Sequence, residues 1–393
     1  INAIGSGANL NLQSDAFTII AVVESAEGAE LFTDDNSGTS FETHKLQNVF
    51  GSVFDSKNVP LSYTDADGNA VTFTLSGGGY GQLILSSSGE VDLAYFNTTA
   101  ASTLKAKVVA APDAEPGSVI HTELRNINPG TLTTARAAIG TVDLGAVDLH
   151  GDAFFRGGVR SLALGDLIDS TSATSHVIDV GAFTKANQAT SVRLGTVTDY
   201  GFRSYMPVNS LTAAQWIDSN PVNELISAVS LKTLSVTGNL EADLRANFDF
   251  NQVAYSKVKL AAFNVGGSLK DATIELGGDA GRVSLGSMVE SHFLVGATSA
   301  DESGYLFTEH SVDSFVIKGA SSVGVLRDSV VAAGRIGSIR IESVDGSGGA
   351  NESGIVAQAI KDYLREGTPS FQKTNLAPGI YDPIGNYSVR VVA

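Results

Sequence analysis

The stretch FNVGGSLKDATIELGGDAGRVSLGSMVESHFLVG, residues 263–296, decides the fold that this sequence predicts. Within it, four short segments of β-forming residues end at Gly266, Gly277, Gly286 and Gly296. Apolar and polar residues alternate along most of them, which is the period of strands with one face in a core. Steps of about ten residues fit neighbouring faces of one β-helix coil. Glycine would let the backbone turn each corner, and we expect positive φ angles there.

The same pattern, a few β-forming residues followed by glycine, recurs outside this stretch. Successive glycines are then roughly 20–40 residues apart, a spacing typical of stacked repeats. A single coil cannot bury its apolar face alone, so the coils must stack. We therefore predict an all-β protein in which residues 129–350 form a right-handed parallel β-helix. A β-sandwich with glycine turns is the alternative. The recurrences lie at 142–145, 162–165, 192–195, 234–238 and 315–319.

The segment before the predicted β-helix has the pattern of antiparallel strands. Val71, Phe73 and Leu75 alternate with threonine and serine, after an Asp-Gly turn and before three successive glycines. Several short strands joined by such turns form a meander or a small sandwich. We therefore predict that residues 1–128 form a small antiparallel β domain.

The segment after the predicted β-helix, residues 351–393, has a helical pattern. Apolar side chains recur at helical spacing across residues 355–366, and Gly367 and Pro369 follow as helix-stop signals. We predict an amphipathic capping helix that covers the end of the solenoid, followed by a strand at residues 387–392.

Composition and charge exclude several classes of function. Charged residues make up 17% of the chain and its net charge is −17, so binding to a nucleic-acid backbone is excluded. The absence of cysteine excludes disulfides and thiolate metal sites. No apolar run is long enough for a transmembrane segment. The chain starts at Ile1 without a signal sequence, as a secreted chain or a fragment would. We predict export through a cleaved signal and an extracellular or cell-surface location.

Residues 63–77, YTDADGNAVTFTLSG, resemble modules of large bacterial exported repeat proteins. In that group an Asp-x-Asp-Gly hairpin precedes glycine-punctuated β-helix coils. Residues 230–240 and 334–339 look similar to the coil phrases of the same group. The resemblance covers residues 61–345 and implies a β-helix at a cell surface or in a matrix. It carries over no catalytic residue.

The turn within that hairpin is the leading candidate metal site, and calcium is the only cofactor that we predict. Asp65, Asp67 and Asn69 present oxygen atoms at every second residue, as in calcium-binding loops. Residues 1–130 carry 15 acidic and 5 basic side chains, a balance that attracts cations. An EF-hand loop needs glutamate at position 76, which is serine. The alternative is a hairpin turn held by its own hydrogen bonds.

A second candidate site lies in residues 198–223. These residues fall between Gly195 and Gly238, the longest interval between successive glycines of the pattern. We predict a protruding loop there, with a short helix at residues 211–217. Aromatic rings stack on sugar rings, so the aromatic side chains of this loop are a candidate glycan-binding site. The alternative is that they form the small core of the loop itself. The four residues are Tyr200, Phe202, Tyr205 and Trp216.

Catalytic residues for polysaccharide cleavage are the third possibility, because paired carboxylates carry out that chemistry on many β-helices. The residues that border the predicted loop are Asp166, Asp169, Asp199 and Asp218, with Arg193 and Arg203 nearby. The Asn-Thr-Asp and Gly-His-Gly phrases of pectinase-like enzymes are missing. We therefore predict that the chain is not an enzyme.

The function that these observations favour is a secreted structural subunit of a bacterial surface layer, sheath or extracellular fibre. Such a subunit would assemble with copies of itself into a lattice or fibre, through β-helix faces and terminal strands. Low charge density and an excess of short polar side chains suit such packing. The alternatives are a carbohydrate-binding adhesin that uses the aromatic loop, and a β-helix polysaccharide lyase or hydrolase.

Overall fold

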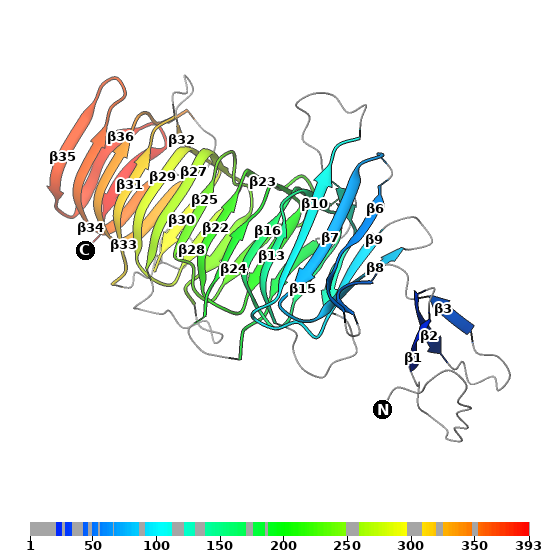
Figure 1. Ribbon diagram of the computed structural model, residues 1–393. Coiled ribbons are helices and arrows are strands. Elements are labelled where there is room, and N and C mark those ends of the chain that lie inside the picture. The colour runs from blue at the N-terminus through cyan, green and yellow to red at the C-terminus, as the bar shows by residue number, and fades with distance from the viewer. Residues whose placement is uncertain are drawn as a thin grey trace.

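The fold consists of strands joined by turns, and the described residues contain no helix. The prediction of an all-β protein is therefore confirmed. The strands are stacked side by side along one long axis (Figure 1). The computed structural model describes residues 21–25, 28–33, 42–45, 49–53, 56–65, 67–85, 91–111, 122–129, 138–169, 176–184, 188–248, 259–296, 309–319, 325–347 and 353–392.

The first three strands form a sheet of their own. They are β1 (Ala21–Ser25), β2 (Gly28–Thr33) and β3 (Glu42–Lys45). Strand β2 pairs antiparallel with both β1 and β3, so this sheet is a three-stranded meander.

Antiparallel strands also begin the large sheet. In one set β7 lies between β6 and β10, and in another β8 lies between β4 and β9, while β5 pairs with β4. Val71, Phe73 and Leu75 are fully buried, as their alternation predicts. The strands are β4 (Val49–Val53), β5 (Ser56–Val59), β6 (Leu61–Thr64), β7 (Ala70–Ser76), β8 (Tyr80–Leu85), β9 (Val91–Phe96) and β10 (Thr103–Val109).

Parallel pairing starts at β9 and β10 without a break in the sheet. Strand β9 pairs antiparallel with β8 and parallel with β12, and β10 pairs antiparallel with β7 and parallel with β13. The predicted boundary between residues 128 and 129 falls inside β12, and the division into domains stays a prediction.

From β10 onward three parallel ladders run along the stack. Ladder 1 contains β10, β13 (Ile139–Leu144), β16 (Val159–Leu164), β19 (Thr190–Arg193), β22 (Val208–Ala213), β25 (Thr233–Val236), β27 (Leu260–Lys270), β29 (Ala280–Val289), β31 (Ser311–Ile317), β33 (Val330–Ile341) and β34 (Ser353–Arg365). The large, mostly parallel sheet that the sequence predicts is therefore present.

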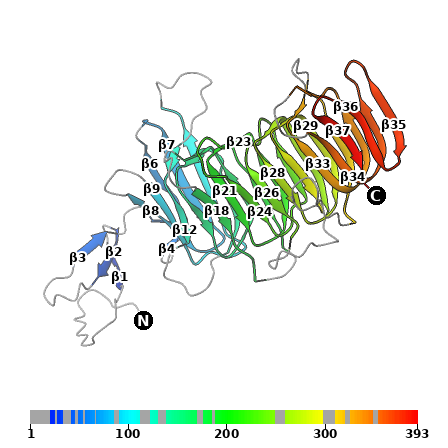
Figure 2. The ribbon, with the colours of Figure 1, turned by 180° about the vertical axis from the view of Figure 1, so that it is seen from behind.

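Ladders 2 and 3 run along the stack together with ladder 1. Ladder 2 contains β12 (Ile127–Pro129), β15 (Ala153–Phe155), β18 (His176–Val180), β21 (Tyr200–Ser204), β24 (Leu225–Ala228), β26 (Asp243–Ala246), β28 (Thr273–Leu276), β30 (His292–Val295), the first halves of β33 and β34, and β37 (Tyr387–Val391). Ladder 3 contains β11 (Thr122–Leu124), β14 (Val147–Leu149), β17 (Leu167–Ile168), β20 (Thr196–Thr198) and β23 (Gln215–Ile217), and continues through Leu240, the ends of β27 and β29, and β32 (Leu326–Arg327). Figure 2 shows ladder 2 from its own side.

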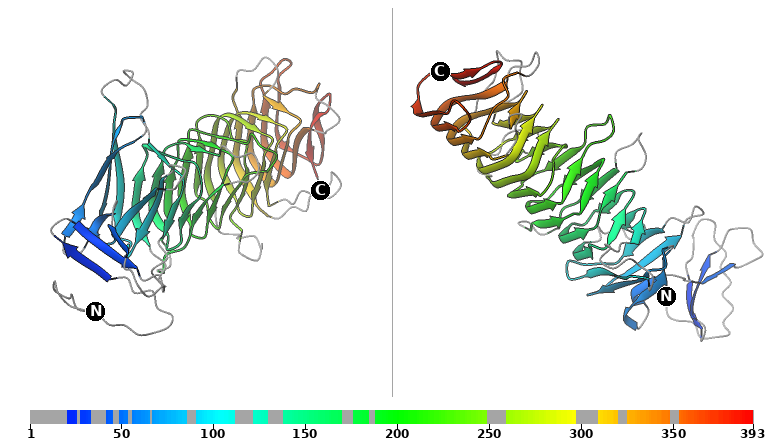
Figure 3. Two further views of the ribbon diagram at one scale, coloured as in Figure 1. Left: turned by 90° about the vertical axis from the view of Figure 1, so that its right-hand side faces the viewer. Right: turned by 90° about the horizontal axis from the view of Figure 1, so that it is seen from above.

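The chain visits the three ladders in one repeated order, ladder 1, then 3, then 2. We call one such passage a circuit. Leu162 of one circuit pairs with Val192 of the next, and the same shift repeats down the stack. This arrangement is consistent with a β-solenoid, and the long axis is seen best in the right-hand view of Figure 3.

The core is a column of apolar side chains that runs the length of the stack. On ladder 1 the inward residues follow one another in register and are buried: Val142, Leu162, Val192, Leu211, Leu234, Phe263, Val283, Phe315, Ile339 and Tyr363. Phe293 of ladder 2 meets Phe263 and Phe315 edge to face, with ring centroids 5.3 and 5.5 Å apart. Each such aromatic pair adds about 0.5–1.5 kcal/mol beyond its buried area.

The glycines of the sequence pattern lie at corners, but not for the predicted reason. At the corner from ladder 1 to ladder 3, Gly195 donates its N–H to the carbonyl oxygen of Gly165, 2.8 Å away. A Cβ at Gly195 would lie 2.8 Å from that same oxygen, so the close approach of the two circuits at this position requires glycine. Of the four glycines that end the β segments of the deciding stretch, only Gly296 has positive φ. The expectation of positive φ at these corners is otherwise wrong.

Positive φ occurs instead at the corner from ladder 3 to ladder 2, and acidic residues adopt it. Asp199, Asp271, Glu290 and Asp328 have φ between 45° and 59°. Asp visits this region more readily than most residues because its side chain can hydrogen-bond locally. The turn of the backbone is therefore made at a corner where the sequence shows no glycine.

The predicted capping helix at residues 355–366 is wrong, because residues 355–365 lie in β34, a strand of 13 residues. Its first half belongs to ladder 2 and its second half to ladder 1. At the corner between them Gln358 and Ala359 are both exposed, so the buried positions shift from Ala357 to Ile360. A strand that changes ladders thus imitates the three-residue step of a helix.

Strands cover the end of the stack in place of a helix. Strand β35 (Phe371–Leu376) pairs antiparallel with the second half of β34, and β36 (Gly379–Ile384) pairs antiparallel with β37. The predicted final strand at 387–392 is confirmed by β37, which pairs parallel with the first half of β34.

A buried ion pair fastens these last strands together. Arg365 of β34 donates from Nε and Nη2 to the two carboxylate oxygens of Asp382 in β36, both at 2.8 Å. Tyr363 donates to the same carboxylate at 2.7 Å and lies 2.9 Å from the hydroxyl of Tyr387. The hydrogen bonds to Asp382 raise the pKa of Arg365, and burial raises the pKa of Tyr363.

The predicted loop at residues 198–223, with its helix at 211–217, is also wrong. The segment contains the last residue of β20 and all of β21, β22 and β23, which belong to ordinary circuits. Ala214 takes the corner position of glycine there, donating to the carbonyl of Gly195 at 3.0 Å and accepting from Gly238 at 2.6 Å. The replacement of one corner glycine by alanine concealed this circuit from the sequence pattern.

Candidate functional site

The predicted calcium turn is held by its own hydrogen bonds. The Asp65 Oδ1 atom accepts from the backbone N–H groups of Asp67 and Asn69, at 3.1 and 2.8 Å. The side-chain amide of Asn69 donates to Asp65 Oδ2 at 3.2 Å, and its oxygen accepts from Ala111 N at 3.1 Å. Among the described residues, no group of three or more acidic or histidine side chains is placed to hold a metal ion. Calcium binding at Asp65, Asp67 and Asn69 stays a prediction.

We expect Asp65→Ala to destabilise the β6–β7 hairpin by about 1–2 kcal/mol, because it removes acceptors for three hydrogen bonds. The matched control is Asp67→Ala, since that carboxylate is exposed and the turn uses only its backbone. Amide hydrogen exchange across the hairpin measures both changes. Equal effects of the two substitutions would contradict the hydrogen-bonded turn. Repeating the measurement in calcium and in chelator tests the calcium prediction, since a bound ion adds about 2.7 kcal/mol at a hundredfold excess over Kd.

Three of the four predicted glycan-binding aromatic residues lie in the core. Tyr200, Phe202 and Trp216 are fully buried. The Tyr200 hydroxyl donates to the carbonyls of Leu149 and Gly151, each at 2.9 Å, and burial raises its pKa. This burial contradicts the exposed aromatic surface that sugar stacking requires.

Tyr205 alone of the four is exposed, at 40%. Its hydroxyl lies 3.3 Å from a guanidinium nitrogen of Arg203 on the outer side of ladder 2. One exposed ring is a common surface feature and forms no platform for a glycan.

The carboxylates considered for catalysis join one circuit to the next. Asp166 Oδ1 accepts from the backbone N–H of Thr196 at 2.7 Å. Asp199 is buried and accepts from both the N–H and the hydroxyl of Ser219, each at 2.6 Å. Backbone N–H groups at the corners need such partners because they have no ladder bond. These two acids therefore act as structural links in the stack.

Asp169 lies beside a histidine rather than beside another catalytic candidate. The His176 ring nitrogens are 3.5 Å from Asp152 Oδ1 and 3.7 Å from Asp169 Oδ1. Asp152 also accepts from the backbone N–H of Val177 at 2.8 Å, again across a corner. Asp218 is partly exposed, and burial raises its pKa.

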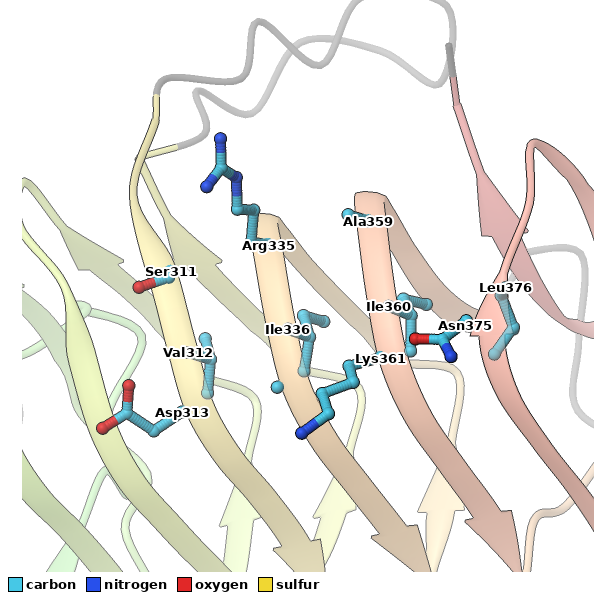
Figure 4. A pocket seen from close by; sticks show the side chains of 11 residues that line it. Ser311, Val312, Asp313, Arg335, Ile336, Ala359, Ile360, Lys361, Asn375 and Leu376 are labelled. Carbon is cyan, nitrogen blue, oxygen red and sulfur yellow. The ribbon is translucent and has the colours of Figure 1, made fainter.

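An open groove of about 460 Å³ lies near the last circuits (Figure 4). It crosses the ladder 1 strands at the end where each of them begins. Strands β31, β33, β34 and β35 each contribute to it. Its base is the backbone of four residues in register, whose apolar side chains are buried in the core: Val312, Ile336, Ile360 and Leu376.

Small residues on the two middle strands create this groove. Gly337 of β33 lies between Asp313 of β31 and Lys361 of β34, and Ala359 is the ladder partner of Arg335. A Cβ at Gly337 would overlap the carbonyl oxygen of Asp313, so no other residue fits there. The longer side chains of Asp313, Arg335 and Lys361 therefore surround a depression at the small residues.

Two cations of the groove have no counter-ion among the described residues. Asp313 is neutralised by Lys259, whose Nζ lies 2.6 Å from its carboxylate. Arg335 and Lys361 are exposed, and neither forms an ion pair with any other described residue. Sequence reasoning missed this groove, because Arg335 and Lys361 are brought together only by the register of β33 and β34.

Comparison with known proteins gives no matching family model, no matching curated protein and no matching solved structure. In the described part of the chain, no helix has the length and apolar character that crossing a membrane requires.

Proposed function

We propose that this chain is an exported structural subunit of a bacterial surface layer, sheath or extracellular fibre, which assembles with copies of itself. It acts without catalysis, and its three ladders close into a right-handed parallel β-helix. The proposed location is extracellular or at the cell surface, after removal of a signal. One observation carries the self-assembly: an uncharged, polar area on the outer side of ladder 1.

This area, which we call the hydroxyl face, lies on β22, β25, β27 and β29. The core-facing residues of these strands are Leu211, Leu234, Phe263 and Val283, so their neighbours in sequence point outward. Successive strands lie about 4.8 Å apart, and their short side chains form two regular rows. The residues are Ser210, Thr233 and Ala262 in one row, and Thr212, Ser235, Asn264 and Ser284 in the other.

The hydroxyl face suits contact with another copy of the chain for two reasons. It contains no charge, and charged residues are depleted at the centres of protein interfaces because taking them out of water is costly. Its side chains are short, so little conformational entropy is lost when they are covered. Arg193 and Arg282 stand at the ends of the two rows and delimit the area.

The alternative functions have less support. An adhesin that uses the aromatic residues lacks its platform, since Tyr200, Phe202 and Trp216 are buried. A lyase or hydrolase would need carboxylates directed at a substrate, whereas Asp166 and Asp199 accept hydrogen bonds from the next circuit.

We expect Ser235→Glu to weaken self-association by about tenfold or more, because a carboxylate in the centre of the contact is placed against like charge or left unpaired. Light scattering behind a sizing column, over a range of concentrations, gives the association constant, and electron microscopy shows whether the assembly is ordered. The matched control is Ser227→Glu on ladder 2, which stands between Arg203 and Arg245 on neighbouring strands.

The control variant should assemble like the parent chain. A parent chain that stays monomeric at all concentrations would refute the structural-subunit proposal. Assembly that persists unchanged in Ser235→Glu would leave self-assembly standing but remove the hydroxyl face from the contact.

A further inference from the structure

We propose that the groove across β31, β33, β34 and β35 binds a uronic acid unit, a sugar that carries a carboxylate, as part of an acidic polysaccharide. This inference does not depend on self-assembly. It rests on the charge of the groove, its shape, and the polar side chains at its rim.

The charge of the groove is opposite to that of the chain. The net charge is −17, so carboxylates are abundant elsewhere on the molecule. Arg335 and Lys361 nevertheless have no described ion-pair partner, while the one acid of the groove, Asp313, is paired with Lys259. An anionic group entering the groove would therefore meet two cations whose charge the described residues leave uncompensated.

The spacing of the two cations suits one sugar unit. Lys361 is two residues further along its strand than Ala359, the ladder partner of Arg335. Strand geometry then puts the two Cα atoms roughly 8 Å apart. Figure 4 shows their side chains on either side of Ile336. A carboxylate between them can accept from both, and the planar guanidinium of Arg335 can bind both of its oxygens.

The remaining lining offers hydrogen bonds to the rest of a sugar ring. The side chains of Ile336 and Ile360 are buried in the core, so the base is made by the backbone of their strands together with Gly337 and Ala359. Asn375 and Ser311 stand at the rim, where an amide and a hydroxyl can bond to sugar hydroxyls. The volume of the open groove, about 460 Å³, lies within the size range of small-ligand sites.

The test uses the full chain and two probes of equal length, an oligogalacturonate and an uncharged oligogalactose. Isothermal titration calorimetry should show binding of the oligogalacturonate, and at least tenfold weaker binding of the uncharged oligomer. Lys361→Ala and Arg335→Ala should each weaken oligogalacturonate binding by about tenfold, the loss expected for one charge-assisted hydrogen bond. Ala359→Phe should block it by filling the groove.

The control is Lys318→Ala, which removes an exposed lysine of the same part of the stack outside the groove. It should bind like the parent chain, and all four variants should keep the parent melting temperature because the positions are exposed. The proposal is overturned if the oligogalacturonate does not bind, if both oligomers bind equally, or if Lys318→Ala weakens binding as much as Lys361→Ala. Loss of self-association in Lys361→Ala without any sugar binding would identify the groove as a contact between copies instead.

Discussion

Replacing Asp382 by alanine should lower the free energy of unfolding of the C-terminal strands by about 3–5 kcal/mol. Asp382 is 6% exposed and Arg365 is 4% exposed. Without the carboxylate, the guanidinium of Arg365 stays buried and keeps only the carbonyl oxygen of Pro369, 2.6 Å from its Nη1. The Tyr363 hydroxyl loses this acceptor at the same time and keeps only the hydroxyl of Tyr387 as a partner. A buried charge without a partner is among the most costly defects that a single substitution can introduce.

Hydrogen exchange across β34–β37, with a thermal melt of the whole chain, measures this loss. The matched control is Asp362→Ala, an aspartate on the outer side of β34, which should cost less than about 0.5 kcal/mol. Because stacked repeats can unfold in parts, exchange should rise mainly in the last circuits. Equal protection in the two variants would show that the ion pair does not hold the end of the stack.

Trp216→Ala should cost about 3–5 kcal/mol, the range for removing a large aromatic side chain from a core. The Trp216 side chain is fully buried on ladder 3, between Val197 and Leu240 of the adjoining circuits. Its Nε1 donates to the carbonyl of Tyr200 at 2.9 Å, so the substitution also leaves that oxygen without this donor. The result is a cavity in the middle of the stack.

The control for this prediction is Tyr205→Ala, since that ring is 40% exposed and should cost less than about 1 kcal/mol. Chemical denaturation followed by tryptophan-independent circular dichroism compares the variants with the parent chain. If Trp216→Ala kept the parent stability, the indole would be at the surface and a sugar-binding role would again be open.

The sequence pattern was sufficient to predict the strand content and the stacking, because glycines recur at corners where two circuits approach closely. Gly195 shows the rule, and Ala214 shows its limit, since alanine at one corner was enough to hide a whole circuit. The error at β34 has another cause. A strand that turns a corner shifts its buried positions at Gln358 and Ala359, and no local pattern distinguishes that shift from a helical step.

The sites were less predictable than the fold. Oxygen-bearing and aromatic residues close in sequence suggested function, yet Asp65 serves a turn and Trp216 serves the core. The groove is made by residues of separate circuits, such as Arg335 and Lys361. Their proximity depends on the register between strands, and register is a property of the folded stack rather than of any short segment.

The repeated order of the ladders has a consequence for how such a protein can evolve. Each circuit touches only the one before and the one after it, so a segment that starts and ends at equivalent ladder positions forms a complete unit. Ile339 and Tyr363 occupy equivalent positions in adjoining circuits. Duplication or loss of the chain between two such positions would change the length of the molecule while every other strand kept its neighbours. The antiparallel strands at the two ends would stay the same, so natural selection could adjust the reach of the molecule independently of its ends.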